Sequence, residues 1–315
     1  MKHSVSLEML RKKEGIKPLQ QYMNNLIEYD KKRAVSLLNE EDLTYPTLYV
    51  LSSYIKEKQL VKYLSDRNKI ALSIQKDILA KERAPAAPFP YSICDLPQYI
   101  HSVLRWMVET GCEEKLNTRY RLVVDRAAGL LTTIYQHPDD LSVVSKLLFE
   151  RKRAGHSTHY ITWAYFSSHH IGSLLPIGEK LLSSNEEEVN FARELLHFIP
   201  GLDQNEEPYA YFRGWYEENL PYLLHNENSY ELTAELAPYI VDHETKYRES
   251  FFPLHTTNLR QNEFHTLSEQ EKEQLANLSY KIRMRSRREW KEWMNRPLSA
   301  QLTFMEEVQH DYDSR

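Results

Sequence analysis

Hydrophobic residues recur every three or four positions along most of the chain, which is the spacing of one face of a helix. Between residues 17 and 39, for example, Leu19, Met23, Leu26 and Ile27 fall on one stripe. Equivalent patterns predict helices over residues 46–64, 66–83, 97–110, 118–136, 139–153, 157–171, 173–184, 186–199, 206–219 and 268–294. We therefore expect an all-α protein.

The spacing of these helices suggests how they are arranged. Like helices recur every ~30–40 residues, which is the period of two-helix repeats such as HEAT and armadillo units. Only eight of the 315 residues are glycine, well below the usual level of about 7%, and this scarcity favours helices joined by short turns. The predicted fold is a set of stacked antiparallel helix pairs, HEAT-like or an irregular α-solenoid, with a helical N-terminal unit and a basic C-terminal helix.

Composition changes along the chain divide it into five segments. Residues 1–83 form the helical N-terminal unit, and residues 84–97 carry four prolines, which predicts a linker or a strap across the fold. The helical-repeat region spans residues 98–243. Residues 244–267 show no clean period and are expected to be a long loop or arm. The basic amphipathic helix and tail occupy residues 268–315.

Smaller signals refine these boundaries. Ser268 and Glu271 have the spacing of a capping box, which predicts a helix start. A short helix is expected from Ser229, interrupted at Pro238. The tail beyond Pro297 is expected to fray.

Charge and cysteine usage restrict the setting of the protein. The net charge is −5, which does not favour nucleic acid as an obligate partner. With only two cysteines, Cys94 and Cys112, a disulfide scaffold is not expected and the reducing cytosol is the default. The N-terminus lacks the apolar core of a signal peptide, and no stretch approaches the ~20 apolar residues of a membrane span. We expect a cytoplasmic protein with no membrane span.

The segment 156–170 contains four histidines, and on a helix His159, Trp163 and His170 share one face. His159 and His170 are eleven residues apart, about 16 Å along a helix, so they cannot bind the same ion. A zinc site needs three or four ligands, and no Cys or acidic partner lies nearby. We expect a helix whose aromatic residues pack against neighbouring helices and whose histidines finish that face with hydrogen bonds or line its solvent edge. His159, Trp163 and His170 are also candidate binding residues. No metal and no cofactor is predicted.

Two charge blocks lie near the C-terminus. Residues 203–249 carry eleven acidic and three basic residues, and residues 281–296 carry seven basic and two acidic residues. The favoured interpretation is that the basic helix docks on the acidic block of its own chain. The alternatives are a separate protein partner, nucleic acid on whose bases the tryptophans stack, or a membrane surface at which they lie in the lipid interface. The candidate binding residues are Arg283, Arg287, Arg288, Trp290 and Trp293.

Aromatic residues surround an arginine in the segment 206–219. An aromatic groove of this kind can hold a peptide, a carboxylate or a planar ligand, although aromatic residues at helical spacing more often form core. The candidate residues here are Tyr209, Arg213, Trp215 and Tyr216.

No local motif assembles a nucleophile, a base and an oxyanion site, and neither a phosphate-binding loop nor a nucleophile elbow is present. The leading prediction is therefore a non-enzymatic adaptor or regulator that binds a protein or peptide along a helical surface. One alternative is a nucleic-acid binder that uses the basic C-terminal helix. The other is an enzyme with a dispersed site, for which the candidates are His159, His170, Glu194, His197 and Arg213.

Overall fold

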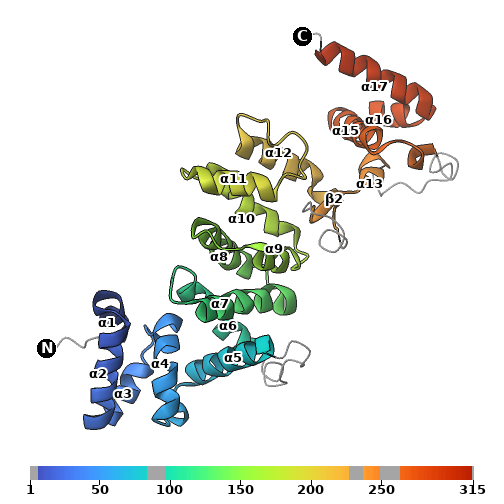
Figure 1. Cartoon of the computed structure of the whole chain (residues 1–315). Helices are drawn as coiled ribbons and strands as arrows, with labels where there is room; N and C mark the ends of the chain where they lie inside the picture. Colours follow the sequence, from blue (N-terminus) through green and yellow to red (C-terminus); the bar gives the residue numbers. More distant parts are fainter. Residues whose placement is uncertain (1–5, 84–96, 227–236, 249–262, 314–315) are drawn as a thin grey trace. The chain divides into compact units, whose positions relative to one another are not determined.

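The computed structural model describes residues 6–83, 97–226, 237–248 and 263–313 (Figure 1). Across these residues helix makes up 75% and strand 2% of the structure, so the prediction of an all-α protein is confirmed. The chain divides into two compact units, Met1–Leu195 (unit 1) and Leu196–Arg315 (unit 2). Apart from Pro97, the proline-rich segment predicted to be a linker or strap lies outside the described residues.

Unit 1 is built of helices joined by short turns. Its α-helices are α1 (Leu7–Glu14), α2 (Ile16–Tyr29), α3 (Lys31–Leu38), α4 (Tyr45–Glu57), α5 (Asp66–Arg83), α6 (Pro97–Gly111), α7 (Thr118–Leu130), α8 (Asp140–Arg153), α9 (His159–Phe166), α10 (Leu174–Gly178) and α11 (Glu186–Leu195). The short helices are η1 (Val61–Tyr63), η3 (Leu131–Tyr135), η4 (Ile171–Ser173) and η5 (Glu179–Leu182).

Alternate helices of unit 1 pack against each other. Helix α6 contacts α4 and α8, while α7 contacts α5 and α9, so two rows of helices run side by side. Between the rows, the fully buried rings of Tyr45 and Tyr120 stack with centroids 5.7 Å apart. The Tyr120 hydroxyl donates to the carbonyl of Gly111 at 3.1 Å. A Cβ at Gly111 would lie 2.6 Å from that hydroxyl, so this position requires glycine.

Several predicted helices are shorter than the sequence pattern suggested. The helix predicted at 17–39 breaks at Asp30, whose side chain accepts a hydrogen bond from the Arg33 amide and starts α3. The helix predicted at 157–171 ends at Phe166, and His169 then adopts a positive φ of 54°. Both breaks reflect local side-chain and backbone geometry that an uninterrupted hydrophobic stripe does not reveal.

Helix α1, which the hydrophobic pattern did not predict, is held to unit 1 by a buried charge cluster. The Arg11 guanidinium is 6% exposed and binds the Glu114 carboxylate through two nitrogens, at 2.7 and 2.9 Å. It also donates to Thr47 on α4 at 2.9 Å. Glu8 accepts hydrogen bonds from Thr47 and, at 2.5 Å, from Thr44. The cluster therefore joins α1 to α4 and to the loop between α6 and α7.

Unit 2 contains helices and one short β-hairpin. Its elements are α12 (Pro208–Asn219), η6 (Leu220–Tyr222), β1 (Leu223–His225), β2 (Tyr239–Val241), α13 (His243–Arg248), α15 (Glu269–Arg285), α16 (Arg287–Met294) and α17 (Leu298–Asp313). The two strands pair antiparallel, with Leu223 opposite Val241. Neither strand was predicted, because three residues are too few to establish the alternation that identifies a strand. Most of the helix expected from Ser229 lies outside the described residues.

The C-terminal part of unit 2 forms a core of its own. The helix predicted at 268–294 starts at the expected Ser268–Glu271 capping box but breaks at Ser286, whose side chain caps α16. The tail does not fray over its described length, because α17 follows and its Gln301 is 1% exposed and accepts from the Tyr247 hydroxyl at 2.7 Å. Tyr247 lies on α13, so the segment predicted to be a long loop also contains a helix. The buried members of this core are Tyr247, Phe264, Leu275, Ala276, Trp290, Trp293 and Met305.

Among the described helices, none combines the length and the apolar composition that crossing a bilayer requires.

Glu8 makes the stability of unit 1 depend on pH. Burial by itself would raise the pKa of this carboxyl, but hydrogen bonds from Arg11, Thr44 and Thr47 outweigh it and lower the pKa from 4.5 to about 2. Because the folded-state pKa lies below the unfolded-state value, the stabilisation by Glu8 is complete above pH 4.5 and is lost as the pH falls toward about 2.

We expect Glu8→Gln to lower the urea midpoint at pH 7, because the variant removes the charge that Arg11 binds. The difference from the wild type should shrink as the pH falls below 4.5. Amide exchange in α1 and α4 measures this locally. The exposed Glu14→Gln on the same helix is the control and should match the wild type. A difference between Glu8→Gln and the wild type that does not change with pH would contradict the assignment.

Candidate functional site

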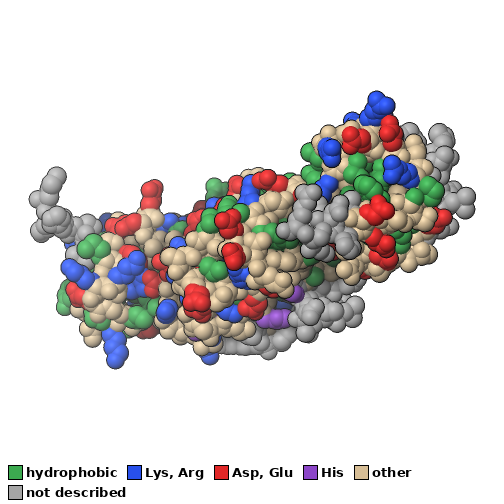
Figure 2. Space-filling model, turned by 90° about the horizontal axis from the view of Figure 1, so that it is seen from above, with side chains coloured by type: hydrophobic (Ala, Val, Ile, Leu, Met, Phe, Trp, Pro, Cys, Tyr) green, Lys and Arg blue, Asp and Glu red, His purple; other side chains and the backbone are tan. Residues whose placement is uncertain are grey.

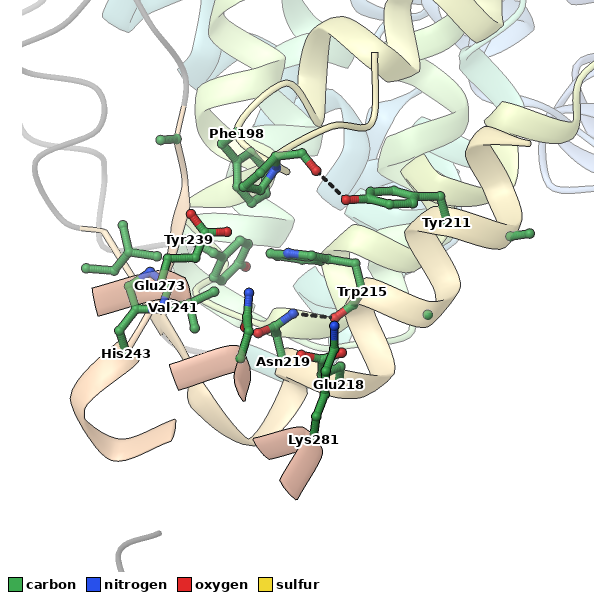
Figure 3. A pocket seen from close by; sticks show the side chains of 16 residues that line it. Phe198, Tyr211, Trp215, Glu218, Asn219, Tyr239, Val241, His243, Glu273 and Lys281 are labelled. Carbon is green, nitrogen blue, oxygen red and sulfur yellow. Dashed lines mark hydrogen bonds between the residues drawn. The ribbon is translucent and has the colours of Figure 1, made fainter. Parts of the chain in front are cut away.

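A cavity of about 560 Å³ lies in unit 2 (Figure 3). Its walls come from the segment before α12, from α12 itself, from β2 and the start of α13, and from α15. It therefore brings together residues that are far apart in the sequence. Its volume is within the ordinary range for small-molecule and side-chain pockets.

One wall of the cavity is aromatic. Tyr211 and Trp215 are four residues apart on α12, so they project from the same face of that helix. The Trp215 ring extends toward Tyr239 of β2, with Phe198 beside it (Figure 3). The rings of Phe198 and Trp215 meet edge to face with centroids 6.0 Å apart. The Tyr211 hydroxyl donates to the Pro200 carbonyl at 2.6 Å, which fixes α12 against the preceding turn.

The opposite wall is a polar stripe on α15. Glu273, Asn277 and Lys281 are spaced four residues apart, which places them on one face of the helix. Glu273 is half-buried and forms no hydrogen bond or ion pair with any residue that the structure describes. Burial raises the pKa of Glu273 above its usual value of 4.5, and the charge of Lys246 opposes this rise. Lys281 is exposed at the other end of the stripe.

Behind these walls, the buried ammonium of Lys246 connects three helices. Lys246 lies on α13 and is 0% exposed. Its Nζ donates to Glu218 Oε1 at 2.6 Å and to Asn219 Oδ1 at 2.7 Å, both on α12. The same amine donates to Asn277 Oδ1 on α15. Burial lowers the pKa of Lys246, and the hydrogen bond to Glu218 partly restores it. The ammonium thus fixes the distance between the aromatic wall and the polar wall.

His243 contributes a further polar group to the cavity. Its Nδ1 is buried and forms no hydrogen bond with any part of the chain that the structure describes. Burial, followed by the charge of Lys246, lowers the pKa of this imidazole from its usual value of 6.5. The arrangement as a whole offers flat apolar surfaces, the Glu273 carboxylate and the His243 imidazole. Among the described residues, no group of three or more His, Cys, Asp or Glu side chains is placed to hold a metal ion.

Unit 1 has a smaller cavity, of about 320 Å³, whose lining includes Cys112 and Arg151. The Arg151 guanidinium donates to Asp125 at 2.8 Å and to the Cys112 carbonyl at 3.1 Å. Burial raises the pKa of the Cys112 thiol, which disfavours the nucleophilic thiolate. Structural ion pairing accounts for these contacts, so the cavity in unit 2 is the stronger candidate.

Of the four candidate residues named in the predicted aromatic cluster, one lines the cavity of unit 2, and Tyr211 of the same cluster lines it as well. Trp215 lines it, whereas Tyr216 is 6% exposed and packs against Phe212 in the core. Arg213 points to a different partner, the Glu217 carboxylate at 2.6 Å. Tyr209 is partly buried and is not part of the lining. The prediction of a ligand groove in this segment remains a prediction, now centred on Trp215.

The predicted row of His159, Trp163 and His170 does not form. The first two lie on α9, and both are exposed, with Trp163 at 38%. His170 lies beyond the end of the helix, where its Nδ1 accepts from the Gly172 amide at 3.1 Å. The row was wrong because it assumed a helix that continues past Phe166.

The basic C-terminal segment also differs from its surface-binding interpretation. Trp290 and Trp293 are each 3% exposed, and the Trp290 indole donates to Ser279 at 2.8 Å, so neither ring is free to stack on a base or on lipid. Arg283 donates to the Tyr222 hydroxyl at 2.6 Å. Arg287 and Arg288 are exposed, and Arg288 pairs with Glu292. The two tryptophans lie on the apolar face of α16 and pack into the core of unit 2, whereas Arg287 and Arg288 stay on its surface.

The candidates for a dispersed enzyme site are not brought together at the cavity of unit 2. Glu194 pairs with Lys152 at 2.9 Å, and Arg213 pairs with Glu217. His197 is partly buried. Of the five candidates, which also include His159 and His170, none is part of the cavity lining in unit 2.

Sequence patterns missed most of the cavity. Glu273, Asn277 and Lys281 were passed over because α15 was judged by its apolar stripe, although their four-residue spacing was readable. Tyr239 begins strand β2 and His243 begins helix α13, and these two elements are too short for the hydrophobic pattern to predict. Lys246 looked like one base inside an acidic block, and only its burial shows its role.

Substitution of Lys246 tests whether its hydrogen bonds hold α12, α13 and α15 together around the cavity. We expect Lys246→Met to destabilise unit 2 by about 3–5 kcal/mol, because it leaves the Glu218 carboxylate facing two amides without its cation. Amide exchange in α12, α13 and α15 under increasing urea measures the loss. Lys281→Met removes an exposed lysine from the same site and should change stability by less than about 0.5 kcal/mol. Equal stability of the two variants would count against the role assigned to Lys246.

Comparisons of the chain with protein-family models, with curated proteins and with solved structures return no match. Function therefore has to be inferred from the geometry of this chain.

Proposed function

We propose that the chain is a non-enzymatic binding protein and that the cavity of unit 2 receives part of a protein or peptide partner. The observation that carries this proposal is the composition of the cavity walls. Trp215 and Tyr211 supply flat apolar area on one side, and Glu273 and Lys281 supply opposite charges on the other. Aromatic rings with a few fixed polar groups are typical of sites that recognise a side chain.

The rigidity of the cavity supports binding. Asn219 donates to the Trp215 carbonyl at 2.8 Å and accepts from Lys246, so it is engaged on both sides. Glu218 and Asn277 are held by the same ammonium. Walls that are fixed before the partner arrives lower the entropy cost of association.

The arrangement of unit 1 adds a second part to the proposal, which is a HEAT-like or irregular solenoid. Its support is the alternation of contacts, in which α4, α6 and α8 form one row and α5, α7 and α9 form the other. Stacks of this kind present extended surfaces on which a partner protein can lie. The proposed adaptor would use unit 1 as an extended binding surface and the cavity of unit 2 as a side-chain pocket.

Recognition of nucleic acid has less support. The buried positions of Trp290 and Trp293 remove the stacking surface that this alternative needs. Acidic and basic side chains are also intermixed over the face seen in Figure 2, whereas phosphate binding favours a concentrated basic surface.

Gly214 provides a way to block the cavity without disturbing its walls. It lies on α12 in the lining, and a Cβ built there meets no atom within 4 Å. A phenylalanine at this position should therefore occupy the cavity and leave the helix intact. Gly214→Ala is the matched control, since it shares the gain of about 0.5–1 kcal/mol from removing a helical glycine but adds only a methyl group.

We expect a displayed library of random peptides to yield binders of the wild-type chain that lose at least about tenfold in affinity, or about 1.4 kcal/mol, on Gly214→Phe. Binding to Gly214→Ala should stay within about threefold, a difference of about 0.6 kcal/mol. Titration calorimetry with each variant gives the dissociation constants. A library that yields no binder, or binders that are unaffected by Gly214→Phe, would contradict the proposal.

A further inference from the structure

We infer that the cavity of unit 2 binds the guanidinium group of an arginine side chain, held between the Trp215 ring and the Glu273 carboxylate. This inference rests on the proposed function and specifies the chemistry of the partner. The juxtaposition that carries it is a half-buried carboxylate, paired with none of the residues that the structure describes, beside an aromatic wall.

The environment of Glu273 is the first feature that points to a bound cation. This half-buried carboxylate has lost solvation, and within the described part of the chain it receives no hydrogen bond or ion pair in return, although the charge of Lys246 acts on it. Burial raises the pKa of Glu273 for this reason. A cation bound in the cavity would supply the missing partner.

The electrostatic field at the aromatic wall has the sign that attracts a cation. Burial is the first cause that raises the pKa of Tyr211, and the negative charges of Glu273 and Glu218 raise it further. Both carboxylates therefore act on the aromatic side of the cavity. The faces of Tyr211 and Trp215 add the negative quadrupole of their rings.

The positive groups near the cavity offset only part of this field at Glu273, because the charge of Lys246 opposes the rise in its pKa and the pKa nevertheless stays raised. The Lys246 ammonium is enclosed by Glu218, Asn219 and Asn277, which use its donors. Lys281 is eight residues from Glu273 on α15, about 12 Å along the helix axis. The cavity thus has a negative end at Glu273 and a positive end at Lys281.

The shape of the site favours arginine among the side-chain cations. A guanidinium is planar, so one face can lie on the Trp215 indole, which projects into the cavity in Figure 3. Its parallel N–H groups match the two oxygens of a carboxylate such as Glu273. A lysine ammonium offers a compact charge that uses the flat wall less well.

The test is an NMR titration of the full chain with the tripeptide acetyl-Gly-Arg-Gly-amide, followed at the tryptophan indole N–H signals. The Trp215 signal is assigned with Trp215→Phe. We expect this signal to shift with a dissociation constant on the order of 1–10 mM, because a single side chain contributes most of the contact. The matched peptide with citrulline, which keeps the shape and removes the charge, should bind at least about tenfold more weakly.

A variant of the polar wall and its control complete the test. Glu273→Gln should weaken the arginine tripeptide at least about tenfold, to the level of the citrulline peptide. The control Glu217→Gln removes an exposed carboxylate of α12 that lies outside the cavity lining, and it should leave the affinity unchanged. Amide spectra that match the wild type away from the cavity show that both variants are folded.

The possible outcomes separate the inference from the proposed function. Equal binding of the arginine and citrulline peptides, tighter binding of a lysine peptide, or no shift of Trp215 at about 20 mM arginine peptide overturns the arginine assignment. The proposed function stands in those cases if library peptides still need the open cavity at Gly214. Binding of the arginine tripeptide without any library binder supports the cation site and contradicts the peptide-binding function.

Discussion

The ammonium of Lys246 is the interaction on which the cavity of unit 2 depends. It is fully buried and reaches acceptors on two helices from a third, so α12, α13 and α15 can take only the spacing that satisfies all three contacts. A buried charge is expensive to desolvate, and it is tolerated only where its partners are well placed. The geometry of Trp215 relative to Glu273 follows from this constraint.

In unit 1, buried arginines likewise fix the positions of helices through ion pairs. The Arg11 guanidinium, buried between Glu8 and Glu114, attaches the first helix, while Arg151 binds Asp125 at 2.8 Å from α8 to α7. Apolar side chains provide most of the favourable free energy of burial, but they are compatible with many relative positions of two helices. Ion pairs and hydrogen bonds select one of those positions, because a shifted helix would leave a buried charge alone.

The two proposals concern different properties of the molecule. Binding in general needs a preformed cavity with apolar area, which the rings of Tyr211 and Trp215 supply. Preference for a cation needs an unsatisfied negative charge, which Glu273 supplies. Contact area and charge selectivity come from different groups in this site, so a substitution can remove one and keep the other. The two can be separated because the aromatic wall and the polar wall lie on different helices.

The sequence by itself determined the class of the fold, most helix positions and the Ser268–Glu271 cap, because helical periodicity and capping are local properties of neighbouring residues. It also contained signals that were masked, such as Ser286 and Glu289, whose capping spacing lay inside an otherwise continuous stripe. Tertiary structure alone decided which aromatic ring faces a cavity and which is core, as the contrast between Trp215 and Trp293 shows. It also decided that Lys246 is buried and that Glu273 pairs with no side chain among the residues described, since burial and pairing depend on residues that are distant in the chain.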